Sequence, residues 1–182
     1  MTLPHETMIQ HLEDSGNFRV LRRLQPGLTA TASEGNHHTG VILDVETTGL
    51  DTGRDEIIEL GMVKFRFTDT GTLVGIDETF SGFQQPGRPI PAEITEITGI
   101  TDAMVAGQSI APNVVTAFAA DASLIIAHNA GFDRRMVERM WPCFIDKHWG
   151  CSASQVNWRA EGLTQTDPAM GITDPLRASK AS

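Results

Sequence analysis

Two acidic residues stand one position apart at the end of an apolar run, in the sequence VILDVETTGL at residues 41–50. Alternate side chains of a β-strand share a face, so Asp44 and Glu46 are expected to point the same way, while the aliphatic side chains around them point into a core. Two carboxylates this close repel each other unless one takes up a proton or a cation lies between them. On this stretch alone, a pair of solvated acids beside a turn remains the alternative.

A third acid lies on the apolar face of a predicted helix, in AHNAGFDRRMVERM at residues 127–140. Asp133, Met136, Val137 and Met140 follow the spacing i, i+3, i+4, i+7 that places side chains on one helix face. A charged group facing a core must be paired or bind a cation. The alternative is that Asp133 only complements the positive end of the helix dipole, a role better suited to an exposed acid. Together with the two strand acids, Asp133 forms a candidate metal-binding set.

The chemistry expected of these acids is metal-assisted hydrolysis. Their oxygen ligands favour Mg²⁺ or Mn²⁺ over zinc. Two such ions, about 4 Å apart, activate a water and stabilise the leaving oxygen when a phosphodiester is hydrolysed. The chain carries a net charge of −9, whereas proteins that hold nucleic acid by neutralising phosphates are usually basic. Nucleic-acid chemistry would therefore depend on bound cations and local contacts.

Glu59 is expected either to lie near this site or to pair with Arg54 or Lys64.

The elements that would position the acids begin with strands and continue with helices. A buried strand over 41–47 is followed by strands over 57–67 and 74–80, joined by short turns as in an antiparallel meander. The second half predicts a short helix ending near Gly99, helices over 110–120 and 131–140, and an apolar strand over 124–127. Strands linked by helices pair in parallel. The predicted fold class is α/β, a mixed sheet that joins an antiparallel meander to parallel strands and is flanked by helices.

The chain is expected to divide into four parts. Residues 1–24 predict a helical N-terminal extension, residues 25–40 a polar linker, residues 41–163 the main domain and residues 164–182 an irregular tail. For the extension, a docking element and a DNA-binding helix-turn-helix are the two interpretations. The two cysteines fit no zinc or redox spacing. No secretory signal and no membrane-spanning run is visible, so a cytoplasmic protein without a membrane partner is expected.

Four ordered blocks resemble the DEDD superfamily of 3′–5′ exonucleases, above all the proofreading, epsilon-type subunits of bacterial DNA polymerase III. They are DVETTGLD at 44–51, DEIIELG at 55–61, PGRPIPAEITEITGITDAMV at 86–105 and LIIAHNAGFDRRMVER at 124–139. The resemblance covers roughly residues 41–160. It implies a ribonuclease H-like fold, two divalent cations, Mg²⁺ or Mn²⁺, and hydrolysis at the 3′ end of single-stranded nucleic acid, DNA before RNA. It also implies a DNA polymerase as a partner.

The resemblance assigns roles to individual residues. Asp44 matches the acid that bridges both ions, Glu46 a ligand of the ion that holds the attacking water, and Asp133 the acid that supports the other ion. Further positions match residues that shape the pocket of the terminal nucleotide, with Ile100 at the position that wedges near the terminal bases. These positions are Thr47, Thr48, Leu50, Ile100, Asn129 and Phe132.

The third motif of this superfamily, His-x-x-x-x-Asp or Tyr-x-x-x-Asp, is missing from the sequence. The chain has no tyrosine, and of its six histidines only His128 precedes an aspartate by five positions, which is Asp133 of the second motif. The last residues, TQTDPAMGITDPLRASKAS, show no amphipathic periodicity. The expected fold is therefore C-terminally shortened, with weak or absent exonuclease activity. The alternative is a catalytically inactive module that binds nucleic acid or a polymerase.

Overall fold

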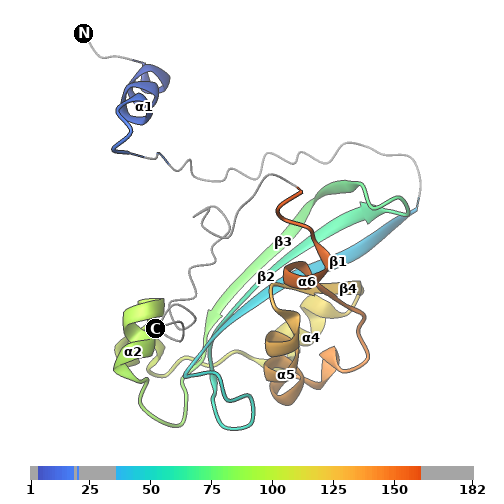
Figure 1. Ribbon diagram of the computed structural model, residues 1–182. Helices are drawn as coiled ribbons and strands as arrows, with labels where there is room; N and C mark the ends of the chain where they lie inside the picture. The colour runs from blue at the N-terminus through green and yellow to red at the C-terminus, as the bar shows by residue number, and fades with distance from the viewer. Residues whose placement is uncertain (1–3, 19, 21–35, 161–182) are drawn as a thin grey trace.

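Five strands form one sheet in the order β3-β2-β1-β4-β5 (Figure 1). Strands β1 (His37–Thr47), β2 (Ile57–Thr68) and β3 (Leu73–Phe83) pair antiparallel as a meander. Strand β4 (Ala122–Ala127) pairs parallel with β1, and β5 (Trp149–Cys151) pairs parallel with β4. This confirms the predicted mixed sheet and its ribonuclease H-like class, with β1 at the centre.

The computed structural model describes residues 4–18, 20 and 36–160. Within them no helix is long and apolar enough to cross a membrane. Figure 1 shows α2 beyond the end of β3, while α5 lies against the sheet near β4. The helices are α1 (His5–Asp14), α2 (Ala92–Thr98), α3 (Asp102–Val105), α4 (Pro112–Ala119), α5 (Ala130–Met140), the 3-10 helix η1 (Pro142–Phe144) and α6 (Ser152–Gln155).

Strand β1 separates a packed side of the sheet from an open side. Val41, Leu43 and Val45 are at most 7% exposed and pack against apolar side chains of α4 and α5. Their neighbour Ile42 is 47% exposed although it lies in the central strand. Asp44 is exposed on that same face. The alternation of β1 therefore buries one face and leaves the acid-bearing face open, as the sequence predicts.

A second, smaller core lies under the N-terminal end of β2. Ile58 packs there with Ile94 of α2 and Val105 of α3. Helix α2 ends at Gly99, whose φ of 74° is the left-handed conformation that favours glycine as a helix stop. The chain then turns back, and Ile100 enters this core at 3% exposure. The helix stop near Gly99 is confirmed.

Strand β1 starts earlier than the sequence indicates. It begins at His37, so residues 37–40 are strand and the linker predicted over 25–40 is wrong at its C-terminal end. The cause is the length of β2, whose last residues pair with them, from His37 opposite Thr68 to Gly40 opposite Phe65. A backbone ladder of this kind accepts polar residues that carry no apolar pattern. Residues 25–35 and the tail at 164–182 lie outside the described residues.

The N-terminal extension is described only in part. Helix α1 falls within the expected 1–24 and contains no buried residue. Residues 18 and 20 are not helical, and residues 19 and 21–24 are outside the described part of the chain. Both cysteines, Cys143 and Cys151, are free thiols, as their spacing predicts.

Candidate active site

Strand β1 places Asp44 and Glu46 on its open face, two residues apart. Across the antiparallel ladder, Asp44 lies opposite Gly61 and Glu46 lies opposite Glu59. Residues opposite each other in a ladder have side chains on the same face, so the carboxyls of Glu46 and Glu59 are neighbours. A Cβ placed on Gly61 would meet only one atom within 4 Å, the backbone oxygen of Asp44 at 3.9 Å. The sheet is therefore open directly beside Asp44.

Helix α5 carries Asp133 against the same strand. Asp133 is 3% exposed and lies on the buried side of the helix with Met136 and Val137. Its Oδ1 accepts a hydrogen bond from the backbone N–H of Val45, at 3.3 Å. That N–H belongs to the peptide that follows Asp44, so Asp133 is fixed at the strand position between the two other acids. The prediction that Asp133 points into the core is confirmed; Met140, at 37% exposure, lies at the edge of the predicted apolar face.

The three acids repel each other in this arrangement. Burial, followed by the charge of Asp44, raises the pKa of Asp133 to about 7. Burial and then the charge of Glu59 raise the pKa of Asp44, although its side chain remains open to solvent, while the charge of His128 lowers it. The pKa of Glu46 is raised by burial, then by Asp44 and Glu59. No ion pair among the described residues joins a lysine or arginine to any of the three. Unbalanced negative charge of this kind favours a cation.

The donor set suits a hard divalent cation, because all of its donors are carboxylate oxygens. Asp44 and Asp133 are brought together by β1 and α5, and Glu46 follows on the strand. Over the ranges that the structure describes, however, no three His, Cys, Asp or Glu side chains are gathered as a preformed metal site. The fold thus brings the three carboxylates near one another without closing them into a cage.

The residues expected at the terminal nucleotide from the β1–β2 loop differ in exposure. Thr47 and Thr48 are each 7% exposed, and their hydroxyls bond within the loop, to the Gly49 carbonyl at 2.6 Å and to Asp55 Oδ1 at 3.2 Å. Leu50 is 64% exposed. Of these three side chains, Leu50 is therefore the one presented to a ligand, while the threonines stabilise the loop.

The other three residues expected to contact the nucleotide also differ in exposure. Asn129 is exposed and has a φ of 62°, which turns the chain into α5. Phe132 is half-buried and packs against the main core. Ile100 lies in the second core, so the expected contact of its side chain with terminal bases does not fit this structure. Ile97, on the preceding turn, is the isoleucine of that segment with an exposed side chain, at 43%.

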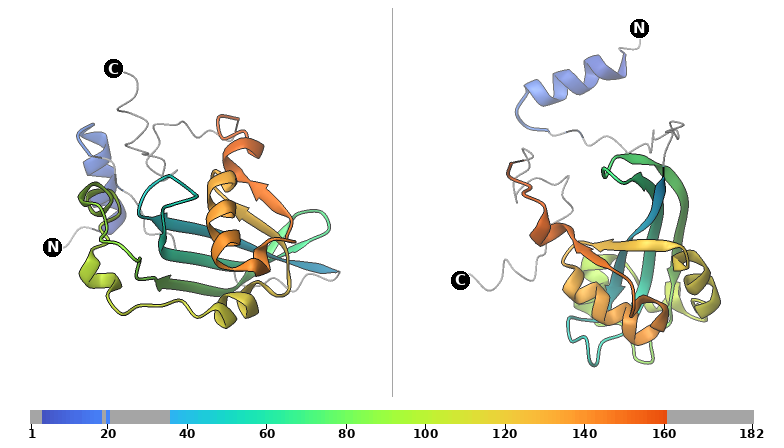
Figure 2. Two further views of the ribbon diagram at one scale, coloured as in Figure 1. Left: turned by 90° about the horizontal axis from the view of Figure 1, so that it is seen from below. Right: turned by 90° about the vertical axis from the view of Figure 1, so that its right-hand side faces the viewer.

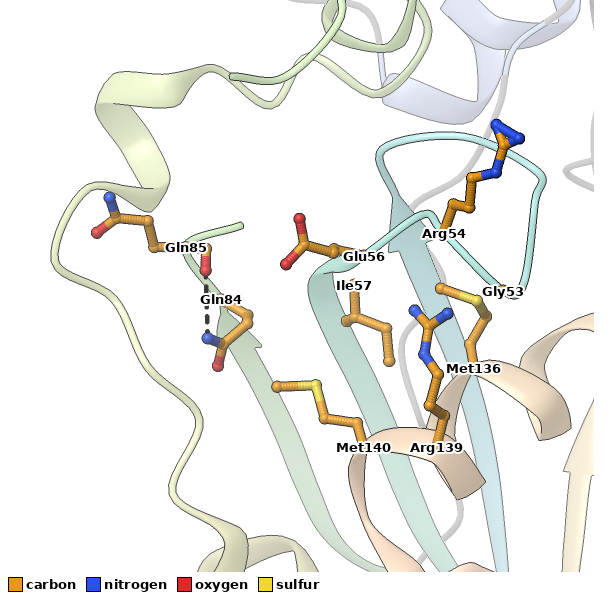
Figure 3. Close-up of a pocket in the computed structure, with 9 residues that line it drawn as sticks. All are labelled: Gly53, Arg54, Glu56, Ile57, Gln84, Gln85, Met136, Arg139 and Met140. Carbon is orange, nitrogen blue, oxygen red and sulfur yellow. Dashed lines mark hydrogen bonds between the residues drawn. The ribbon is translucent and has the colours of Figure 1, made fainter. Parts of the chain in front are cut away.

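A pocket of about 430 Å³ lies between the β1–β2 loop, the end of β3 and α5 (Figure 3). Arg139 reaches from α5 across it and donates hydrogen bonds to the carbonyls of Thr52 and Asp55. Its lining does not include Asp44, Glu46 or Asp133. Arg139 within the pocket therefore supports the loop, and the three acids lie outside the pocket. The lining consists of Gly53, Arg54, Glu56, Ile57, Gln84, Gln85, Met136, Arg139 and Met140.

Two further residues, Glu59 and His128, lie near the acids and act on their charges. Glu59 accepts a hydrogen bond from Ser81 Oγ at 3.1 Å and faces Glu46; it does not pair with Arg54 or Lys64, which bind other acids. His128 directly follows β4, and its charge reaches Asp44. Neither position could be found from spacing alone, because both depend on the register between strands.

The sequence of this domain is similar to sequences of known proteins. A family profile described as exonuclease matches residues 41–156. The chain is 40% identical over 101 residues to a PolC-type DNA polymerase III of Clostridium perfringens and 41% identical over 104 residues to a DNA polymerase III subunit epsilon-like protein of Rhodobacter capsulatus. These matches cover 54% and 56% of this chain but 7% and 14% of the relatives, so the chain spans a small part of their length.

Among solved structures, exonuclease I of E. coli in complex with a dA16 oligonucleotide is similar at a TM-score of 0.48 and 16% identity, covering 63% of this chain and 28% of that one. The family match extends over more than half of the 182 residues and includes Asp44, Glu46 and Asp133. The chain therefore belongs to the exonuclease family, with its nuclease domain over residues 41–156.

Proposed function

We propose that this chain is a 3′–5′ exonuclease domain that removes nucleotides from the 3′ end of single-stranded nucleic acid, DNA before RNA. The observation that carries the proposal is the contact between Asp133 and the β1 backbone beside Asp44. It holds two acids from different elements close enough for the charge of Asp44 to raise the pKa of the Asp133 carboxyl, after the larger effect of burial. Acids placed in this way, in a domain of this family, are suited to phosphodiester hydrolysis.

Asp44, Glu46 and Asp133 are the residues that would hold two divalent cations, Mg²⁺ or Mn²⁺. When bound, such ions supply an activated water and stabilise the leaving oxygen of the scissile bond. Asp133 is oriented by the Val45 amide, which leaves its second oxygen free to act as a ligand. Asp44 and Glu46 are oriented by the pleat of β1, which points both carboxyls to the open face. Leu50, on the exposed loop, is placed to contact the sugar or base of the terminal nucleotide.

The experiment is digestion of 5′-labelled single-stranded DNA by the pure protein with Mn²⁺. The expected product is a ladder shortened one nucleotide at a time from the 3′ end, lost in Asp44→Ala and retained in Asp121→Asn. Asp121 is a matched control because its carboxyl pairs with Lys64, away from the three acids. No cleavage at stoichiometric protein, together with no heat of Mn²⁺ binding in calorimetry, would reject both the activity and the metal site.

A catalytically inactive module that binds a nucleic-acid 3′ end or a DNA polymerase is the second candidate. It is favoured by the sequence, in which the one His-x-x-x-x-Asp, His128 to Asp133, overlaps the second motif. The sequence therefore offers no separate third-motif histidine as a general base, and a general base typically contributes a factor of about 10²–10⁴ to the rate. Oligonucleotide binding that is as tight in Asp44→Ala as in the wild type, without cleavage by either, would select this candidate.

A further inference from the structure

The imidazole of His128, which neighbours the indole of Trp158, lies beside Asp44 on the open face of the sheet. In the parallel ladder Ile42 of β1 lies opposite Ile126 of β4. Two residues further along each strand are Asp44 and His128, which continue the same row and therefore share the same face. The charge of His128 acts on the Asp44 carboxyl, in agreement with this placement. The imidazole is thus the neighbour of Asp44 on the β4 side, as Gly61 is on the β2 side.

The C-terminal part of the domain fixes both rings. His128 Nδ1 lies 3.0 Å from Ser152 Oγ, and the Trp158 indole Nε1 donates to the Ser152 carbonyl at 2.7 Å. The two ring centroids are 6.5 Å apart and the ring planes are tilted by 48°. Both hydrogen bonds use the edges of the rings, so neither bond occupies a ring face. Ser152 therefore orients both rings, of which His128 is the one next to Asp44 and Trp158 is its neighbour.

Trp158 is not placed like a core residue. It is half-buried, and its neighbours Asn157 and Arg159 are exposed. The other two tryptophans belong to the main core, with Trp141 at 1% exposure and Trp149 packed on Phe144. A tryptophan at the surface, next to an arginine and within reach of a nuclease site, has the chemistry of a base-stacking platform.

The charge of the protein favours such a platform. With a net charge of −9, the chain offers little positive field to hold a nucleic-acid strand by its phosphates away from the proposed cations. Stacking of bases on aromatic rings needs no positive field and tolerates any base. We infer that Trp158, oriented by Ser152 and His128, stacks on a base of the single strand next to the terminal nucleotide and positions the strand at Asp44. This inference rests on the proposed function of the site.

The test uses two titrations with oligo(dT) that carries phosphorothioate linkages at its 3′ end so that it is not shortened. In the first titration the oligonucleotide also carries a 5′ fluorophore. Anisotropy of the label reports binding of the strand. In a parallel titration with unlabelled oligo(dT), tryptophan fluorescence reports stacking. The expected result is quenching in the wild type that is lost in Trp158→Phe and retained in Trp149→Phe, the control. Trp158→Ala should weaken binding about tenfold, and Trp158→Phe, which keeps a ring, should recover most of the affinity.

The salt dependence separates stacking from a merely structural role. Because stacking involves no counterion release, the ratio of wild-type to Trp158→Ala affinity should stay constant while both affinities fall with added salt. Tight binding by the wild type with equal affinity in Trp158→Ala, or with quenching that survives in Trp158→Phe, overturns the inference and leaves the proposed function standing. No binding of the strand by the wild type overturns both.

Discussion

The backbone N–H of Val45 donates a hydrogen bond to Asp133 Oδ1 at 3.3 Å and thereby joins the strand of the first two acids to the helix of the third. One bond of this kind sets where a buried carboxylate lies relative to Asp44. It also concentrates negative charge, because no lysine or arginine forms an ion pair with either acid within the described ranges. Several consequences of this contact can be measured.

The metal-free protein should lose stability as the pH rises from about 4 to about 7. The pKa of Asp133 in the fold, about 7, lies above its ordinary value of 3.8. Between these values the unfolded chain releases its proton while the folded protein keeps it, so the free energy of unfolding falls, and above about 7 it falls no further. A shift of this size corresponds to about 4 kcal/mol. Thermal melts in EDTA across this range check it; Asp133→Asn should flatten the profile, and an unchanged slope in that variant would contradict the assignment.

Divalent cations should reverse this loss. A ligand that binds the folded state at 100 times its Kd stabilises by about 2.7 kcal/mol. Mn²⁺ is therefore expected to raise the Tm at pH 8 and to have little effect at pH 5, where the Asp133 carboxyl holds its proton. The increase should disappear in Asp44→Ala and persist in Asp121→Asn. Equal increases in all three proteins would place the binding of Mn²⁺ elsewhere.

Replacing Arg139 should loosen the β1–β2 loop without affecting metal binding. Arg139 donates from α5 to the carbonyls of Thr52 and Asp55, and each such charged bond contributes about 1–2 kcal/mol. Arg139→Met should lower the Tm by several degrees. It should also raise the KM for single-stranded DNA, because the same loop presents Leu50 to the terminal nucleotide in the proposed function.

The matched control is Arg135→Met, which removes a bond to the Gly131 carbonyl within the same helix. Calorimetry should give the same Mn²⁺ affinity for both variants and the wild type. A loss of Mn²⁺ affinity in Arg139→Met alone would mean that the loop contributes to the metal site.

Neighbouring positions of β1 should differ sharply in what they contribute to stability. Leu43 is 1% exposed in the main core, so Leu43→Ala should cost about 2–5 kcal/mol. Ile42 is 47% exposed on the open face, and Ile42→Ala should cost less than about 1 kcal/mol. Urea titrations of the two variants measure the difference. Similar losses would mean that something covers the open face in solution.

Patterns within one element could be predicted from the sequence, and contacts between elements could not. The alternation around Asp44 and the helical spacing through Asp133 each depend on a few adjacent residues, and both were predicted correctly. For Glu59 the sequence leaves two interpretations open, because its position opposite Glu46 depends on the β1–β2 register, which shifts just beyond, between Glu46 and Thr47. The start of β1 at His37 depends on β2 in the same way.

Ile100 shows a different reason for failure. Its spacing of three from Ile97 suggests a shared helix face, but the left-handed Gly99 ends the helix between them. Beyond that stop the helical period no longer applies, so Ile100 turns inward and Ile97 remains outside. For His128 the sequence shows only its spacing to Asp133, whereas its position beside Asp44 follows from pairing between β1 and β4.

Strand β4 ends at Ala127 and α5 begins at Ala130, so two residues form the whole connection. Asn129 makes that turn in the left-handed conformation, and the chain has no slack there. The helix that carries Asp133 is consequently tied directly to the end of β4, the neighbour of the strand that carries the other two acids, so the placement of Asp133 is a property of the scaffold rather than of a long loop.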